Sequence, residues 1–165
     1  LSGIAELGIL SVPPIHQNNF DVLFRRKEKI VCVTAENSIF LKGITAPTLP
    51  ELAECPLCLS TGCHLMMSKI FAEKSIRPQV LSICTTRTTA LRWAEDDCGV
   101  SIVPMEPREK LADGLIAKAI TGVNTDLYKT VVRVKGRPLS VVSKKFLQFY
   151  SDVRDSERMI KVKDL

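Results

Sequence analysis

The feature that most constrains the fold of this chain is a repeated alternation between short apolar runs and segments with helical spacing. Three apolar runs of strand length are separated by two segments whose apolar side chains recur every three or four residues. The runs are residues 56–60, 78–84 and 99–104, and the helical segments are 63–74 and 86–97. Strands that alternate with helices form units in which neighbouring strands run parallel. The sequence therefore predicts an α/β fold with a largely parallel sheet.

The amino-terminal residues add further strand patterns. Residues 4–12 form an apolar run that Pro13 and Pro14 end, because proline supplies no N–H for a strand ladder. Residues 20–24 alternate between apolar and polar side chains, and residues 29–34 form another apolar run. We expect three separate strands here.

Helix boundaries are marked by capping residues. Thr48 and Thr86 are each placed to cap a helix that follows, and Gly99 is placed to end the second of these helices as a glycine cap. Residues 128–134 alternate as a strand does. Ser140 begins a final amphipathic helix that reaches about residue 154. The side chains that we expect to pack inward from it are Val141, Phe146, Phe149 and Val153.

Composition limits the environment and the partners. The chain has 165 residues, of which 45% are hydrophobic and 25% charged, enough for one core or two small ones. No apolar run approaches the ~20 residues that span a bilayer, and the start lacks a signal-peptide pattern, so we expect no membrane contact. The charge of +5 comes from scattered lysines and arginines, which disfavours a nucleic-acid surface in this chain. Six irregularly spaced cysteines indicate a reducing compartment, and hence the cytoplasm.

Four motifs in a fixed order resemble the effector-binding domain of LysR-type transcription regulators. Residues 1–9 resemble its Leu-x-x-Gly-x-x-Asp-x-Gly-Ile strand, with Glu6 where Asp is usual. Residues 20–33 resemble the segment that crosses between its lobes, and residues 99–104 (Gly-Val-Ser-Ile-Val-Pro) resemble its Gly-Leu-Gly-Ile-Ala-Leu-Leu-Pro signature. Residues 130–147 resemble its closing strand, turn and helix. The similarity extends over nearly the whole chain.

This resemblance implies two Rossmann-like lobes of periplasmic-binding-protein type II, joined by crossovers near residues 33–37 and 135–139. Lobe I would comprise residues 1–33 and 137–165, and lobe II residues 34–136. The chain begins on Leu1, without an initiator Met. We therefore expect the DNA-reading winged helix-turn-helix and part of lobe I to precede Leu1, and the full-length protein to be a homodimer or tetramer that contacts DNA only through that missing domain.

An effector in the cleft between the lobes is also implied. Open α/β sheets bind ligands beyond the carboxyl ends of their strands, where helix N-termini supply N–H donors. The residues predicted to line this cleft are Ser11, Val12, Pro13, Ser60, Thr61, Gly62, Cys84, Thr85, Thr86, Val103 and Pro104. Two of these clusters are rich in hydroxyls, which suits an anion, and Arg87 is near enough to a helix start to reach it. The alternative for each threonine is a plain helix cap, and for Arg87 a surface salt bridge.

Cys55, Cys58, Cys63 and His64 have a spacing that occurs in metal sites. We expect no metal, because Cys58 falls inside an apolar strand. Cys63 is a candidate redox residue, since a helix N-terminus lowers the pKa of a thiol. The peroxide-sensing branch of the LysR family has Gly-His-Cys here and a second cysteine two helical turns later, and the second cysteine is missing.

No nucleophile elbow, phosphate loop or complete dinucleotide fingerprint occurs, so we expect neither an enzyme nor a cofactor. The leading hypothesis is a regulatory domain that binds a small, anionic effector and thereby alters DNA binding and transcription. Two alternatives stay open: a solute-binding protein of a transporter, and a thiol redox sensor that acts through Cys63.

Overall fold

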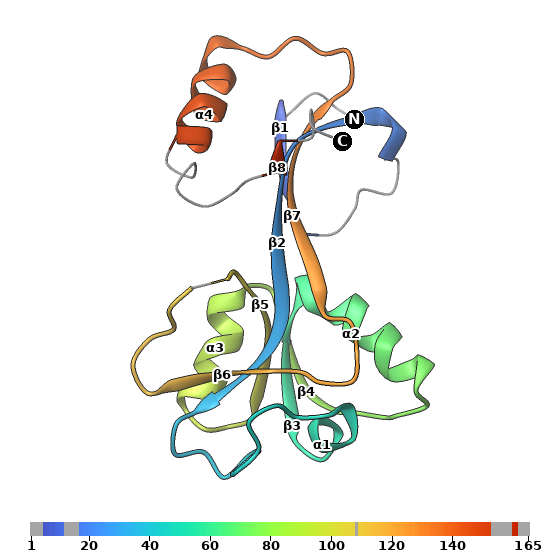
Figure 1. The fold of residues 1–165 in the computed structure, drawn as a ribbon, viewed down its shortest axis with the longest axis vertical. Helices are drawn as coiled ribbons and strands as arrows, with labels where there is room; N and C mark the ends of the chain where they lie inside the picture. The colour runs from blue at the N-terminus through green and yellow to red at the C-terminus, as the bar shows by residue number, and fades with distance from the viewer. Residues whose placement is uncertain (1–4, 12–16, 108, 153–159, 162–165) are drawn as a thin grey trace. The chain divides into compact units, whose positions relative to one another are not determined.

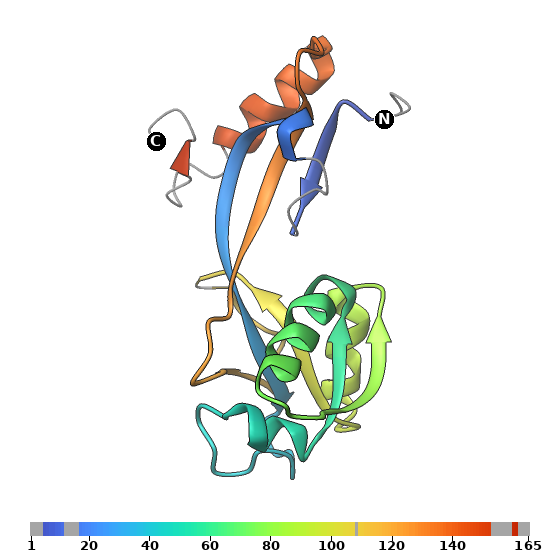
Figure 2. The same cartoon turned by 90° about the vertical axis from the view of Figure 1, so that its right-hand side faces the viewer.

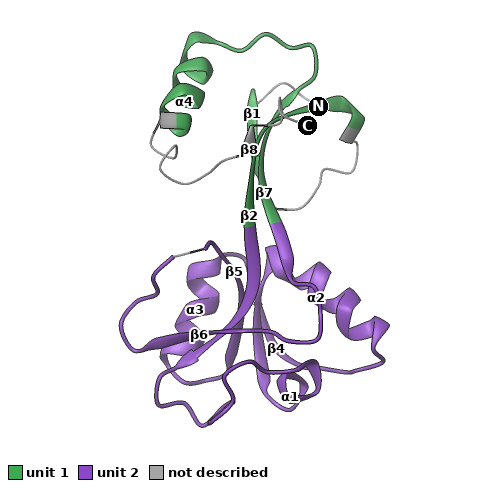
Figure 3. Cartoon of the chain, viewed as in Figure 1, with its two compact units in different colours: residues 1–27, 128–165 green, residues 28–127 purple. Residues whose placement is uncertain are grey.

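The structure is a computed structural model, and it describes residues 5–11, 17–107, 109–152 and 160–161. The chain divides into two compact units, which Figure 3 shows in different colours. Unit 1 comprises residues 1–27 and 128–165, and unit 2 comprises residues 28–127. Unit 2 is thus one continuous stretch of chain, whereas unit 1 is formed by the two ends.

Unit 2 contains the parallel strands that the sequence predicts. Its strands are the second half of β2 (Phe20–Ala35), β3 (Pro56–Ser60), β4 (Gln79–Cys84), β5 (Val100–Met105) and β6 (Leu115–Ala119). β3 lies between β4 and β5 and is parallel to both, with Ser60 opposite Cys84 and Leu59 opposite Ile102. β2 is antiparallel to β5 and to β6. The α/β class is confirmed, but the sheet is mixed, and only β3, β4 and β5 are parallel.

β2 is a single strand of 16 residues. The prediction of separate strands at residues 20–24 and 29–34 is wrong, because the charged residues between them continue the same extended run. Glu28 and Ile30 are both buried, two positions apart, as expected for a strand with one face turned inward. Charge in the intervening segment therefore did not mark a loop.

The helices of unit 2 are α1 (Leu49–Ala53), α2 (Thr61–Glu73) and α3 (Arg87–Glu95). Two of the three, α1 and α3, begin where capping residues predict, whereas α2 begins two residues before the predicted start at residue 63. At α1 the Glu51 carboxylate accepts hydrogen bonds from the N–H and the hydroxyl of Thr48, both at 2.7 Å. At α3 the Thr86 hydroxyl oxygen accepts the N–H of Thr89 at 3.1 Å. Both predicted caps are confirmed.

Helices α2 and α3 cover opposite faces of this sheet (Figures 1 and 2). The larger core cluster lies under α2 and includes Leu57, Leu59, Met67, Phe71 and Ile102. The smaller cluster lies under α3 and comprises Val33, Cys84, Ala90, Ala94 and Val103. The small side chains let α3 approach the sheet closely, and the Ser101 hydroxyl donates to the carbonyl of Ala90.

Gly99 has a different role from the predicted one. The left-handed residue after α3 is Asp97, with φ of 50°, so Gly99 is not the helix cap. A Cβ on Gly99 would lie 2.5 Å from the carbonyl oxygen of Pro56. Glycine is needed here because the start of β5 passes directly against the start of β3.

Unit 1 is built from antiparallel strands and one helix. With the first half of β2 it contains β1 (Leu7–Leu10), the short 3-10 helix η1 (Gln17–Asn19), most of β7 (Asp126–Val134), α4 (Val141–Asp152) and β8 (Ile160–Lys161). β1 pairs with β7, with Ile9 opposite Val131, and β8 pairs with β2. The predicted strand at 128–134 is confirmed. The strand at 4–12 is confirmed for Leu7–Leu10, and residues 4 and 12 lie outside the described residues.

Helix α4 is held at its start by a carboxylate from the other end of the unit. Glu6 accepts hydrogen bonds from the N–H of Ser140 at 3.1 Å and from its hydroxyl at 2.8 Å. The Ser143 hydroxyl donates to the same oxygen. Ser140 in turn caps the helix, because its hydroxyl oxygen accepts the N–H of Ser143 at 3.2 Å. The predicted helix start is confirmed, and Glu6 ties it to the segment before β1.

The predicted inward face of α4 is wrong. Val141 is 74% exposed and Phe149 69%, and Phe146 is exposed as well, while Val153 lies outside the described residues. The helix instead turns Tyr150 toward β2, where its ring centroid lies 5.9 Å from that of Phe24. None of the helices in the described ranges is long and apolar enough to cross a membrane.

Candidate functional site

The carboxyl ends of β3, β4 and β5 meet at one edge of unit 2, here called the carboxyl edge. Ser60 ends β3 and lies opposite Cys84, the last residue of β4. Leu59 lies opposite Ile102, so the next residue of β5, Val103, reaches the same edge. Three of the four predicted clusters therefore come together, namely Ser60–Gly62, Cys84–Thr86 and Val103–Pro104.

The fourth predicted cluster, Ser11 to Pro13, belongs to unit 1. Ser11 directly follows β1, as predicted, and Val12 and Pro13 lie outside the described residues.

The threonines at the carboxyl edge have structural partners. The Thr61 hydroxyl donates to the carbonyl of Cys84 at 2.9 Å, which fastens the end of β3 to the end of β4. The Thr86 hydroxyl caps α3 and also lies 2.8 Å from the hydroxyl of Thr89. Thr85 is exposed. For Thr61 and Thr86, the structural roles account for the hydroxyls without a ligand.

Ser60 differs from these threonines. It is 4% exposed, and its hydroxyl oxygen has no hydrogen-bond partner among the described residues. It precedes the first residue of α2, yet its side chain accepts no N–H from that helix. Leaving a buried hydroxyl without a partner costs about 1–3 kcal/mol. A polar group from outside the chain would recover this energy.

Arg87 is the first residue of α3, and its ion pair uses only part of its guanidinium group. Its Nη1 lies 2.5 Å from Oε1 of Glu109, with side-chain exposures of 31% and 28%. The salt bridge that the sequence left as an alternative is therefore present. The Nε of the same guanidinium, however, is buried, and no described residue forms a hydrogen bond with it. Arg87 can thus keep Glu109 and still donate a hydrogen bond to an acceptor.

Cys63 lies among these groups, fully buried in the first turn of α2. Burial raises the pKa of its thiol to about 11; the Ser60 hydroxyl lowers it, Glu28 raises it and Arg87 lowers it. The Ser60 hydroxyl acts on the Cys63 sulfur, but the geometry between these two groups is not that of a hydrogen bond. The predicted lowering of the Cys63 pKa is wrong, because the loss of solvation outweighs the helix N-terminus. The charges of Glu28 and Arg87 thus both act on the Cys63 thiol.

Two further residues near these groups are Gly62 and Glu28. A Cβ placed on Gly62 would meet nothing within 4 Å, so the first turn of α2 faces open space. Glu28 is 2% exposed and is the residue that the sequence analysis missed. The available signal was its parity, because the period of two in β2 puts Glu28 on the same face as Ile30 and Cys32.

The remaining cysteines behave as small apolar side chains. Cys55, Cys58 and Cys84 are buried, Cys98 is exposed, and all of them are free thiols. Burial raises the pKa of Cys58 to about 11. Within the described ranges, no three His, Cys, Asp or Glu side chains are placed to hold a metal ion.

Comparisons with known proteins agree on one family. The family model described as the LysR substrate binding domain matches residues 1–155. The chain is similar to the effector-binding domain of QuiR, solved in complex with shikimate, at 21% identity and a TM-score of 0.73, covering 92% of this chain and 73% of that one. It is also similar to the regulatory domain of CcmR from Synechocystis PCC6803, solved with 2-PG, at 16% identity and a TM-score of 0.76, covering 93% and 76%.

A third similar structure is the cofactor-binding domain of the Cbl transcriptional regulator, at 15% identity and a TM-score of 0.73, covering 88% of this chain and 65% of that one. At these identities the likeness shows a shared fold. No curated protein matched the sequence.

Proposed function

The chain belongs to the LysR substrate-binding domain family, a family of regulatory domains and not of enzymes, and we propose that its effector is a small anion bound at the carboxyl edge of unit 2. The observation that carries this proposal is that two buried polar atoms, Ser60 Oγ and Arg87 Nε, receive no hydrogen bond from the residues that the structure describes. Ser60 lies opposite Cys84, the end of the strand that leads into α3, and Arg87 is the first residue of α3.

The chemistry of these two atoms favours an anion. Arg87 Nε offers an N–H directed into a buried region, where a hydrogen bond to a charged acceptor is strongest. A carboxylate or phosphate oxygen accepts from this N–H and from the Ser60 hydroxyl together. The N–H groups of the first turn of α2 add a favourable field for negative charge. Shikimate and 2-PG, the ligands of the two similar domains, are consistent with this class.

The wider arrangement is proposed from the family. The chain supplies parts of two Rossmann-like lobes of the periplasmic-binding-protein type, with lobe I comprising residues 1–33 and 137–165 and lobe II residues 34–136. The full-length regulator is a cytoplasmic homodimer or tetramer. Effector binding shifts its conformational equilibrium and so the affinity of a separate DNA-reading domain.

A ligand screen with matched variants tests the site. The full-length protein is melted with benzoate, succinate, citrate, shikimate and inorganic phosphate, and the anion that raises the melting temperature most is titrated by calorimetry. We expect Arg87→Gln to weaken its binding about tenfold or more, the usual worth of a hydrogen bond to a charged group. Arg92→Gln is the matched control, since Arg92 lies on the same helix and pairs with Glu95. Equal losses in both variants, or no response to any anion, would count against the site.

The two alternatives make different forecasts. A thiol sensor needs a reactive Cys63, whereas full burial and a raised pKa make this thiol a poor nucleophile. Cys63→Ser should abolish a response to peroxide if Cys63 is the sensor, and should leave a response to an anion intact under the present proposal. A secretion signal encoded upstream of Leu1 would instead support a transport solute-binding protein.

A further inference from the structure

A second hollow in unit 2 lies away from the carboxyl edge. It has a volume of about 710 Å³ and is bordered by the end of β2, the loop of residues 36–45 and the strand β6. Val33, next to this end of β2, lies opposite Ser101 near the start of β5, whereas the carboxyl edge is at the other end of β5. The loop hollow, as we call it, is therefore a separate place on the molecule.

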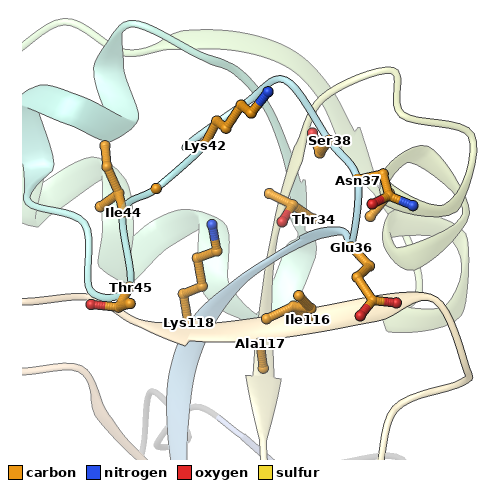
Figure 4. Close-up of a pocket in the computed structure, with 12 residues that line it drawn as sticks. Thr34, Glu36, Asn37, Ser38, Lys42, Ile44, Thr45, Ile116, Ala117 and Lys118 are labelled. Carbon is orange, nitrogen blue, oxygen red and sulfur yellow. The ribbon is translucent and has the colours of Figure 1, made fainter.

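Two ammonium groups at this hollow lack carboxylate partners. Lys118 Nζ donates to the carbonyl of Leu41 at 2.8 Å. Among the described residues no carboxylate lies within ion-pair distance of Lys118 or Lys42, and Glu36, which also lines the hollow, points away from both (Figure 4). Since an ammonium has three donors, Lys118 retains N–H groups for a ligand. With two ammonium groups and one carboxylate, the lining of the hollow has a net positive charge.

The wall of the loop hollow is held in an unusual backbone conformation. Leu41 has φ of 54°, a left-handed value that a non-glycine residue rarely adopts, and its side chain is buried in the core. Its carbonyl accepts from Lys118 and also from the N–H of Ile44 at 3.1 Å. Residues held in this way recur at ligand sites, where the surrounding structure keeps the strained loop in place. The hollow is thus pre-formed.

Its lining also offers apolar surface. Ile44 and Ile116 lie on facing sides of the hollow, and Ile116 is one of the exposed large apolar side chains of unit 2 (Figure 4). Sites for small organic molecules are ~300–1,000 Å³ hollows that combine apolar walls with a few placed polar groups. The loop hollow has this combination.

We propose that the loop hollow is a second binding site, for a small organic carboxylate with an apolar body. The carboxylate binds between the ammonium groups of Lys118 and Lys42, and the apolar body packs on Ile44 and Ile116. This site is independent of the effector site at the carboxyl edge and does not rest on it.

Hydrogen exchange on the full-length protein tests this proposal with benzoate as the probe and benzamide as its uncharged counterpart. Benzoate is expected to slow exchange in residues 36–45 and 115–119 saturably, and benzamide is not. Lys118→Gln should raise the dissociation constant for this effect about tenfold. Lys42→Gln should raise it several-fold. This second variant guards against misfolding of the first, because no hydrogen bond to another described residue holds the Lys42 ammonium. Lys69→Gln, a change at an exposed lysine of α2, should have no effect.

The two sites are separated by Arg87→Gln, which should leave protection of the loop hollow unchanged. Four results would overturn the second site: no saturable protection by benzoate, equal protection by benzamide, unchanged affinity in both lysine variants, or loss of protection in Arg87→Gln. None of them bears on the anion titration at the carboxyl edge, whose readout is the effect of Arg87→Gln on the anion selected there.

Discussion

Two buried polar atoms distinguish the carboxyl edge from an ordinary sheet edge. The hydroxyls of Thr61 and Thr86 form hydrogen bonds within the fold. In contrast, no described residue forms a hydrogen bond with Ser60 Oγ or Arg87 Nε. Natural proteins pair nearly all of their buried polar groups with protein or ordered water, so these two atoms are the candidate contacts for a ligand. The unpaired Ser60 hydroxyl therefore lowers the stability of the ligand-free protein, whereas the same hydroxyl would strengthen anion binding.

We expect Ser60→Ala to stabilise the ligand-free protein by about 1 kcal/mol, because it removes a buried hydroxyl without a partner. The same change should weaken anion binding, because it removes a donor to the ligand. Urea denaturation and calorimetric titration measure the two effects. Ser68→Ala, at an exposed position of α2, is the control for helix propensity. A fall in both stability and affinity would mean that Ser60 has a structural role.

Gly99 gives a second prediction at the residue scale. We expect Gly99→Ala to lower the free energy of unfolding by about 1–3 kcal/mol, since the new methyl group would meet the backbone carbonyl of Pro56. Gly62→Ala should not destabilise the protein, because its methyl group enters open space. Thermal melts of both variants check this pair, and similar losses in the two would refute the packing account.

Prediction from the sequence was least accurate for the properties of single residues, as the pKa of Cys63 shows. A helix N-terminus was expected to favour the Cys63 thiolate, an effect of about 0.3–1 kcal/mol. Burial moves the pKa from 9.0 to about 11, which corresponds to about 3 kcal/mol in the other direction. The position of Cys63 at a helix start was readable from the sequence, but its full burial depended on packing in the core cluster under α2.

At the scale of elements, periodicity was informative where an element packs on both sides. β3, β4, β5 and the helices α2 and α3 were all predicted, because buried strands and amphipathic helices have distinct periods. The continuity of β2 was missed because its middle is charged. The orientation of α4 was missed because an amphipathic pattern shows that a helix has an apolar face, but not which element covers it.

Glu6 makes the start of α4 sensitive to pH. Hydrogen bonds from the hydroxyls of Ser143 and Ser140 and from the Ser140 N–H lower its pKa below 4.5. The lowered value means that this contribution to stability is present above about pH 4.5 and is lost as the pH falls through the pKa of the folded state. The protection factors for hydrogen exchange in residues 141–152, which correct for the pH dependence of exchange in an unfolded chain, should therefore fall in acid in the wild-type protein. In Glu6→Gln they should be lower at neutral pH and change less with acid, and identical pH profiles would contradict the role of Glu6.

At the scale of the molecule, binding of a ligand to unit 2 should raise the free energy of unfolding. A ligand that binds only the folded state stabilises it by about 2.7 kcal/mol at 100 times its dissociation constant. We expect the selected anion to produce this gain in the wild-type protein, and a smaller gain at the same concentration in Arg87→Gln. Denaturation with and without the anion measures the difference. A gain that is unaffected by the variant would place the anion elsewhere.

The central claim is that the carboxyl edge of unit 2 binds the effector through Ser60 and Arg87. The most direct measurement is a crystal structure of the full-length protein with the anion that stabilises it most. The account predicts an anion oxygen within hydrogen-bond distance of Ser60 Oγ and Arg87 Nε. An anion bound at another place, with these two atoms still without a partner, would contradict it.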